Sequence, residues 1–233
     1  MLKNIPLFPL NTVLFPDGIL PLRIFEIRYL DMVSESLRNE SPFGICLISK
    51  GKEVGNPAEC NRIGTFAHII DWEKGDDGIL GITVQGGKRF RIIDQRTRSN
   101  KLLEGDVEIM EEDEEEELPV EYQLLSDLLR QIAEKFELPH LSDEEKYLNA
   151  GWVGCRLAEL LPFELDDKQL LLEISDPLNR LEPRTPRSLS LYNAMVLRAL
   201  SSISRLSVIS TSRNSPSTPN SSRLSVIVFT RSF

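Results

Sequence analysis

The first thirty residues combine large apolar side chains with four prolines, and the pattern predicts a strand, a turn, a second strand and a helix. Residues 5–10 are apolar, but the prolines between positions 6 and 21 fix φ and remove backbone donors. Such a segment forms neither a helix nor a central strand that is paired on both sides. Pro16-Asp17-Gly18 predicts a turn. Apolar residues alternate through 20–24 as in a half-buried strand, and from residue 26 the period is helical.

The stretch from Pro42 to about Met110 is typical of short strands separated by turns. Residues 43–48 form a continuous apolar run that is short enough for a buried strand. Gly86-Gly87 indicates the connection of a β-hairpin. Turn signals about every ten residues favour a small barrel-like or folded antiparallel sheet. The other predicted strands cover residues 63–72, 79–84, 90–93 and 102–109.

An unbroken acidic run, Glu111 to Glu117, follows the predicted sheet. Like charges at this density repel one another and stay solvated, which favours a linker. The alternative is a docking surface for a basic partner.

Beyond the acidic run the apolar pattern is helical as far as residue 182. Leucine stripes on short segments predict helices that pack as a compact bundle, because short helices are not stable alone. The predicted helices begin after Pro119, at a capping-box pattern of Ser142 with Glu145, at Asp166 with Gln169, and at Asp176-Pro177.

The composition changes abruptly after Glu182. Residues 183–233 contain 14 serines, four prolines and seven arginines, without a lysine or an acidic residue, and Ser-Arg-Leu-Ser-Val-Ile occurs at 204–209 and again at 222–227. We interpret this tail as a non-native segment translated in a shifted reading frame. The alternative is a disordered basic arm. The encoding DNA distinguishes the two interpretations.

The net charge of −9 is divided unevenly between these parts. Subtracting the seven arginines of the tail from the 27 basic residues leaves 20 in residues 1–182, against 36 acidic residues, a net charge of −16. An acidic body disfavours nucleic-acid binding, because affinity for phosphates comes mainly from lysine and arginine.

Composition and length are those of an ordinary globular chain of one large or two small domains. Hydrophobic residues make up 41% and charged residues 27% of the 233 positions. We expect no membrane span and no secretory signal, because no apolar run is long enough and the N-terminus lacks the signal pattern. Cys46, Cys60 and Cys155 form no even framework, so we expect reduced thiols and a cytoplasmic protein.

Residues for catalysis or metal binding are not arranged in a recognisable pattern, so we expect no enzyme, no cofactor and no metal. The segment nearest to a phosphate-binding loop, Gly81 to Arg89, lacks the required Gly-Lys-Ser/Thr and is interpreted as a β-hairpin. The cysteines are far apart, and His68 and His140 have no companion ligands at suitable spacing. We interpret His68 as a satisfied sheet residue, His140 as exposed and Cys155 as a core residue.

Residues 6–10, 15–16 and 20–29 resemble the opening of the Lon protease N-terminal substrate-binding domain, with its Pro-Leu-Phe-Pro-Leu strand and Leu-Pro-Leu-x-Ile-Phe-Glu-x-Arg-Tyr segment. Residues 87–92 resemble a sheet segment of this family, and residues 152–161 and 168–173 resemble its helices. The resemblance spans about residues 4–182. It implies an α+β fold: a PUA-like antiparallel β pseudo-barrel lobe in residues 1–117, which end in the acidic linker, and a helical bundle in residues 118–182. Residues 183–233 form the atypical tail.

The resemblance also implies a non-catalytic module that binds unfolded or partner polypeptides. The ATPase and protease modules of an intact Lon protease are not expected in this chain. The alternatives are an RNA-binding PUA-like module and an accessory subunit that is related to peptidases by descent only; the oligomeric state stays open. For the aromatic side chains near the start, including Phe8 and Phe25, two positions are open: the lining of a groove or the core. For Arg28 the alternatives are contact with a client and an ion pair with an acidic residue. The candidate substrate-binding residues are Phe15, Arg23, Arg28, Tyr29 and Arg91.

Overall fold

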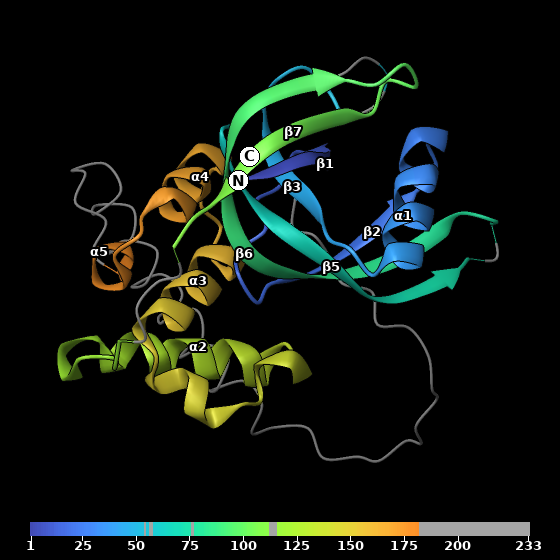
Figure 1. Cartoon of the computed structure of the whole chain (residues 1–233). Coiled ribbons are helices and arrows are strands. Elements are labelled where there is room, and N and C mark those ends of the chain that lie inside the picture. Colours follow the sequence, from blue (N-terminus) through green and yellow to red (C-terminus); the bar gives the residue numbers. More distant parts are fainter. Residues whose placement is uncertain (54, 56–57, 76, 112–115, 182–233) are drawn as a thin grey trace, which may run out of the picture.

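The computed structural model describes residues 1–53, 55, 58–75, 77–111 and 116–181, and the predicted tail lies outside these residues. A curved, mainly antiparallel sheet lies beside a group of helices (Figure 1), which confirms the expected combination of sheet and helices. The strands are β1 (Leu2–Leu10), β2 (Ile19–Ile24), β3 (Phe43–Lys50), β4 (Glu59–Cys60), β5 (Ile63–Lys74), β6 (Leu80–Thr97) and β7 (Leu103–Ile109). The helices are α1 (Ile27–Asn39), α2 (Gln123–Lys135), α3 (Ala150–Leu160), α4 (Leu165–Glu173) and α5 (Pro177–Leu181), with short 3-10 segments η1 (Val120–Tyr122), η2 (Pro139–Leu141) and η3 (Glu144–Leu148).

Five of the strands close into a ring. Their order is β1-β7-β6-β5-β3, and β1 returns to pair in parallel with β3, from Leu7 beside Gly44 to Leu10 beside Leu47. The remaining pairings are antiparallel. β2 and β4 lie outside this ring, on β6 and β3. Because β2 lies outside the closed ring and pairs with β6, it is an edge strand, a position that tolerates the missing backbone donor of Pro21.

β6 is one strand of 18 residues that passes through Gly86 and Gly87, so the hairpin predicted there is wrong. Gly86 instead allows the segment before β2 to lie directly on β6. Asp17 N donates to Gly86 O and Gly86 N donates to Gly18 O, both at 2.8 Å. A Cβ at position 86 would lie 2.1 Å from Phe15 O. The sequence therefore places glycine here for a close backbone contact and not for a turn.

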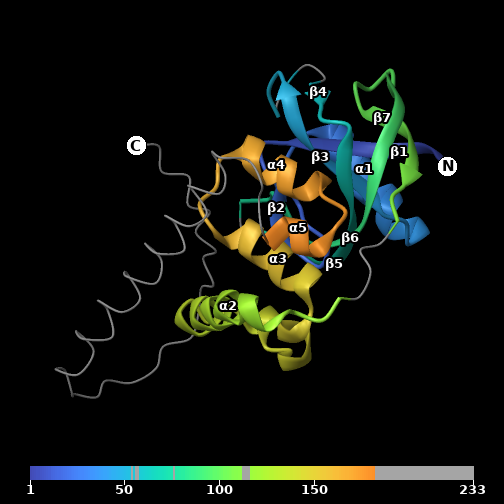
Figure 2. The ribbon, with the colours of Figure 1, turned by 90° about the vertical axis from the view of Figure 1, so that its left-hand side faces the viewer.

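α1 closes one side of the ring with its apolar face. Tyr29, Met32 and Val33 are buried and pack with Phe8 and Phe43 from the strands. In Figure 1 and in the view turned by 90° (Figure 2), α4 and α5 lie on the opposite side of the ring from α1.

The starts of the middle helices differ from the prediction. Asp143, and not Ser142, caps η3, and its side chain accepts a hydrogen bond from Glu145 N at 3.2 Å. α3 begins only after Asn149, whose side chain accepts from Trp152 N at 2.8 Å. The capping box predicted at Ser142 is therefore wrong.

The starts of the last two helices lie close to the expected positions. The N-cap residue of α4 is Glu164, so Asp166 lies in the first turn and is not the cap. At α5, Asp176 acts as expected, because its Oδ1 accepts from Asn179 N at 2.8 Å.

The end of the acidic run is hydrogen-bonded to the start of α3, because Glu116 O accepts from Ala150 N at 2.9 Å. Residues 112–115 lie outside the described part of the chain.

α3 and α4 share a core with the strands. Phe15 is fully buried against Cys155 of α3, the core position expected for this cysteine, and against Leu171 and Leu172 of α4. Arg89 of β6 is also buried, and its Nη1 donates to Leu172 O at 2.8 Å. Within the described residues, each helix is too short or too polar to cross a membrane.

Candidate functional site

A groove of about 180 Å³ lies between β1, β2 and the start of α1, and we call it the β1–β2 groove. Most of its lining is apolar. Phe8 and Leu10 come from alternate positions of β1, which face the same side of a strand. The groove is lined by Phe8, Leu10, Pro21, Leu22, Arg23, Ile24, Phe25, Glu26, Tyr29 and Glu53.

Two large apolar side chains are exposed where β2 leads into α1. Phe25, in the groove lining, is 58% exposed, and Ile27 is 76% exposed. They flank Glu26, the N-cap residue of α1, and the buried face of α1 begins with the next residues, Arg28 and Tyr29. Full burial of one such side chain stabilises a contact by about 1.5–3 kcal/mol. The groove therefore offers apolar surface that a partner could cover.

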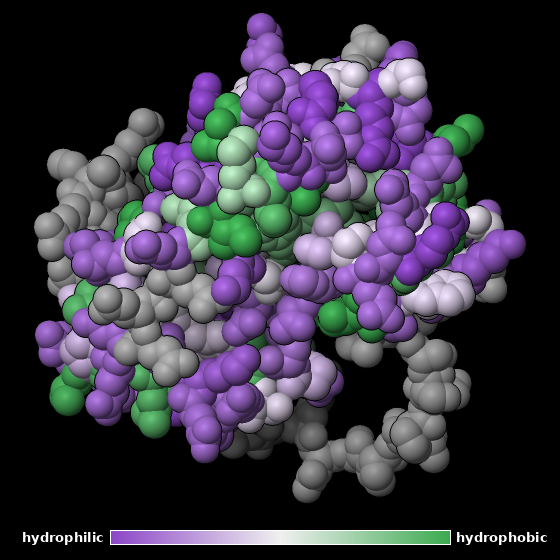
Figure 3. All heavy atoms as spheres, viewed as in Figure 1, coloured by the Kyte–Doolittle hydropathy of each residue, from purple (hydrophilic) through white to green (hydrophobic). Residues whose placement is uncertain are grey.

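The wider surface is mostly hydrophilic. Figure 3 shows purple side chains over most of one face, with green apolar side chains gathered over the strands near the N-terminal end of the chain. Ile93 of β6 and Ile109 of β7 are about half exposed. Single exposed apolar side chains are ordinary on a protein surface, so only a contiguous apolar area indicates a contact site.

Tyr29 forms an aromatic wall of the groove. Its ring stacks on Phe8 with 4.1 Å between ring centroids. Burial raises the pKa of Tyr29 to about 12, because desolvation penalises the tyrosinate, and the nearby Arg28 offsets part of this effect. At neutral pH the groove therefore presents a neutral aromatic phenol.

Arg28 lies behind this wall and is only 6% exposed. Its Nη2 lies 2.9 Å from Glu26 Oε2, and its Nη1 donates to Lys101 O at 2.9 Å. Its guanidinium also lies 4.6 Å from the ring centroid of Tyr29. These contacts join the start of α1 to the β6–β7 connection, so Arg28 supports Glu26 and Tyr29 in the groove.

Arg23 is the exposed cation of the groove. It pairs with Asp77 in the β5–β6 connection, and 67% of its side chain is exposed. The hydrogen bond from Ile79 N, together with the charge of Arg23, holds the pKa of Asp77 below its usual value. Exposed ion pairs contribute little to stability. The guanidinium can therefore exchange Asp77 for a ligand carboxylate at small cost.

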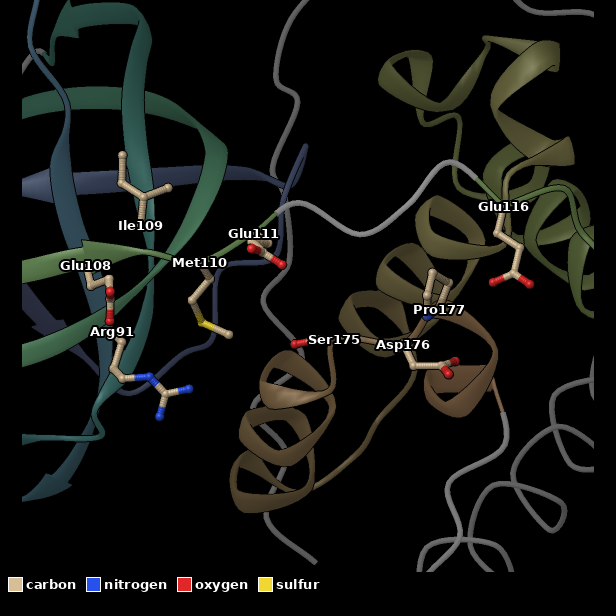
Figure 4. Close-up of a pocket in the computed structure, with 9 residues that line it drawn as sticks. All are labelled: Arg91, Glu108, Ile109, Met110, Glu111, Glu116, Ser175, Asp176 and Pro177. Carbon is tan, nitrogen blue, oxygen red and sulfur yellow. The ribbon is translucent and has the colours of Figure 1, made fainter. Parts of the chain in front are cut away.

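The other two predicted residues lie elsewhere. Phe15 is fully buried between the strands and α3. Arg91 lines a separate cavity of about 590 Å³ between β6, β7 and the α4–α5 region (Figure 4), together with Glu108, Glu116 and Asp176. The structure thus brings Arg23 and Tyr29 together, places Arg28 behind them, and separates Phe15 and Arg91 from them.

A third cavity, also of about 590 Å³, was not predicted. It lies between the β1–β2 turn, the middle of β6 and the start of α3, and its lining includes His68, Lys88, Lys146 and Trp152. His68 lies on β5, paired with Gln85 in the sheet as expected, and its exposed side chain borders this cavity. His140 is exposed. Among the described residues, His, Cys, Asp and Glu side chains do not gather in groups of three or more that could hold a metal ion.

Two residues were not predicted from the sequence: Ile27, which is exposed beside the groove, and Glu53, which lines it. Ile27 lies three residues beyond the predicted strand at 20–24, at the start of the expected helix, and its side chain is 76% exposed. Glu53 reaches the groove from the segment after β3 and accepts a hydrogen bond from Asn11 N. The signal for Ile27 was an apolar residue at the start of the expected helix, whereas for Glu53 no local signal existed.

Comparisons with known proteins agree with this architecture. The model of the family described as ATP-dependent protease La (LON) substrate-binding domain matches residues 4–185. The crystal structure of a Lon N-terminal domain protein from Xanthomonas campestris is 38% identical, with a TM-score of 0.66 over 78% of this chain and 96% of that one. The N-terminal domain of Mycobacterium avium complex Lon protease has a TM-score of 0.56 at 16% identity, over 77% of this chain and 95% of that one, and supports the fold alone.

Curated relatives are Lon proteases that are much longer than the matched segment. The Lon protease of Dictyoglomus thermophilum is 28% identical over an alignment of 188 residues that covers 78% of this chain and 24% of the relative. Lon protease 2 of Myxococcus xanthus is 26% identical over 181 residues, 74% of this chain and 22% of the relative. The chain therefore spans about a quarter of the length of these relatives. The resemblance noted in the opening residues is confirmed, and the chain belongs to the family of Lon protease substrate-binding domains.

Proposed function

We propose that this chain is a non-catalytic recognition module that binds exposed segments of other polypeptides in the β1–β2 groove. The observation that carries the proposal is the pair of exposed apolar side chains, Phe25 and Ile27, beside an apolar groove in a substrate-binding family. Covering them with an apolar side chain of a client provides a favourable free energy of contact.

The charges of the groove favour a particular kind of segment. Arg23 is the exposed cation, Glu26 is held by Arg28 and is therefore partly neutralised, and Glu53 accepts a hydrogen bond from Asn11 N. A client with an aromatic or aliphatic residue next to a carboxylate would match this arrangement, because Arg binds carboxylates in a fixed planar geometry. The acidic body in residues 1–182 disfavours RNA as a ligand.

The proposal assigns separate roles to the two parts of the fold. We propose a PUA-like lobe in residues 1–117, which contains the groove, and a helical lobe in residues 118–182, which supports it. Support comes from two apolar clusters, one that joins α1 to the strands and one that joins α2, α3 and the segments between them; a third cluster connects the lobes through α3 and α4. The module would act on clients in a reducing cytoplasm without cleaving them.

Replacing both exposed apolar residues, Phe25→Ser with Ile27→Ser, is expected to weaken polypeptide binding at least tenfold. A tenfold change in the dissociation constant corresponds to about 1.4 kcal/mol. This is less than the free energy that burial of one such side chain contributes. Fluorescence anisotropy with fluorescein-labelled, reduced and carboxymethylated lactalbumin measures the dissociation constant.

The matched control is Phe136→Ser, because Phe136 at the end of α2 is 56% exposed and lies outside the groove. This control should bind like the unmodified chain. Equal losses in both variants, or no loss in the double variant, would contradict binding in the groove.

A further inference from the structure

Cys46 and Cys60 lie against each other at the edge of the ring. Cys46 belongs to β3 and is buried, whereas Cys60 belongs to β4 and is partly exposed. β4 pairs antiparallel with β3, with Cys60 beside Ile48, which places Cys46 on the diagonal. Cys60 packs against the apolar cluster that contains Cys46, and Asn61 N donates to Leu47 O at 2.9 Å just beyond them.

The exposed side of this pair opens into a small cavity. Cys60 lines a cavity of about 270 Å³ together with Glu59, Arg62, Ile92 and Asp94. The guanidinium of Arg62 supplies hydrogen-bond donors for oxygen atoms of a small ligand. The cavity thus gives a small polar oxidant access to Cys60, while Cys46 stays behind it in the apolar cluster of β1, β6 and β7.

We propose that Cys60 and Cys46 form a reversible disulfide site that responds to a small hydroperoxide. Cys60 sulfur attacks one oxygen of the hydroperoxide ROOH, the S–O bond forms and the O–O bond breaks. The RO group leaves as ROH with the proton of the Cys60 thiol (water when the oxidant is hydrogen peroxide), and Cys60 becomes a sulfenic acid. Cys46 sulfur then attacks Cys60 sulfur, the S–S bond forms, the S–O bond breaks, and the hydroxyl leaves as water with the proton of Cys46. A low-molecular-weight thiol reverses the reaction and is itself oxidised to its disulfide.

The two thiols have different roles because their surroundings differ. The hydrogen bond with Cys60, followed by burial, raises the pKa of Cys46 well above its usual value. Cys46 therefore stays protonated until a sulfenic acid forms beside it. Contact with the resolving thiol also protects Cys60 from further oxidation.

A disulfide would tie β4 to β3 across the segment between positions 46 and 60. Such a link restricts the unfolded chain and stabilises the fold. Stabilisation by the disulfide does not involve polypeptide binding, so its test is independent of the function proposed for the groove.

The test treats the full-length protein with an equimolar amount of hydrogen peroxide, followed by denaturing alkylation and mass spectrometry. The expected product has an intact mass lower by about 2 Da before alkylation and carries one alkyl group, on Cys155, after it; digestion gives a peptide pair linking Cys46 to Cys60. The melting temperature should rise by about 5 °C or more and return to its first value after dithiothreitol. Cys46→Ser should lose the linked peptides and the melting-temperature shift, and Cys155→Ser should keep both.

Two results would overturn the proposal. One is accumulation of Cys60 sulfinic or sulfonic acid in the unmodified protein without a Cys46–Cys60 link. The other is a link that forms equally fast in the protein unfolded in urea, because the proposal requires the folded contact and the Arg62 cavity. Arg62→Gln should slow the reaction severalfold without changing the final product.

Discussion

Replacing Gly86 with alanine is expected to lower the free energy of unfolding by about 3 kcal/mol or more, since overpacking alone costs about 1–3 kcal/mol and backbone contacts are lost as well. The added Cβ would lie 2.1 Å from Phe15 O and 3.0 Å from Phe15 C, which are backbone atoms. The segment before β2 must then move away from β6, and the hydrogen bonds of Asp17 and Gly18 with Gly86 are lost. Urea unfolding followed by circular dichroism measures the loss.

Gly81→Ala is the matched control on the same strand. A Cβ at Gly81 would lie 3.3 Å from Glu73 Cγ, the nearest atom, which belongs to a flexible exposed side chain. We expect a change within about 0.5 kcal/mol for this variant. Equal effects at the two glycines would show that Gly86 is not needed for close contact with the β1–β2 segment.

Arg156→Ala is expected to destabilise the protein by about 3 kcal/mol, because it removes one partner of a buried ion pair. Arg156 is 1% exposed. Its Nη1 lies 3.1 Å from Glu159 Oε2, and its Nη2 donates to Pro16 O at 2.5 Å. The side chain thus joins α3 to the turn before β2. Arg38→Ala, an exposed position in the last turn of α1, should change stability by less than about 0.5 kcal/mol.

The effect of Arg156→Ala should depend on pH in a defined direction. Burial raises the pKa of Glu159 above its ordinary value of 4.5, while Arg156 and Lys168 oppose this rise. Without Arg156 the folded-state pKa rises further, so the folded state holds a proton that the unfolded state has released. Stability then falls as the pH increases above 4.5.

The loss in free energy of unfolding caused by Arg156→Ala should therefore be larger at pH 7.5 than near pH 5. Urea unfolding at both pH values measures it. Adding Glu159→Gln to Arg156→Ala should reduce this pH dependence, because the buried carboxyl is then absent. A deficit that is independent of pH would contradict the role assigned to the ion pair.

Much of the groove was accessible to sequence reasoning because its parts are close together in the chain. The proline positions and the change from strand to helix near residue 26 correspond to β1, β2 and α1. Arg23 and Tyr29 were candidate binding residues of this segment, and Phe8 was expected either in a groove or in the core. Glu53 did not follow, because its position depends on how the segment after β3 folds back.

The incorrect predictions also depend on contacts between segments that are far apart in the sequence. Two adjacent glycines indicate a turn locally, but Gly86 serves a contact with Phe15, which is far away in the sequence. Several polar residues before α3 are able to cap a helix, and tertiary packing selects Asp143 and Asn149 over Ser142. Phe15 and Arg91 are separated from the groove by the packing of α3 and α4, which no local pattern encodes.

Site-specific crosslinking tests the central claim most directly. A photoreactive phenylalanine analogue is placed at position 25 in one protein and at position 136 in another, and each is irradiated with the unfolded lactalbumin probe. We predict strong capture from position 25, competition by unlabelled probe, an intact probe after release, and only background capture from position 136. Equal capture from both positions, or cleavage of the probe by the purified chain, would contradict a non-catalytic module that binds polypeptides in the β1–β2 groove.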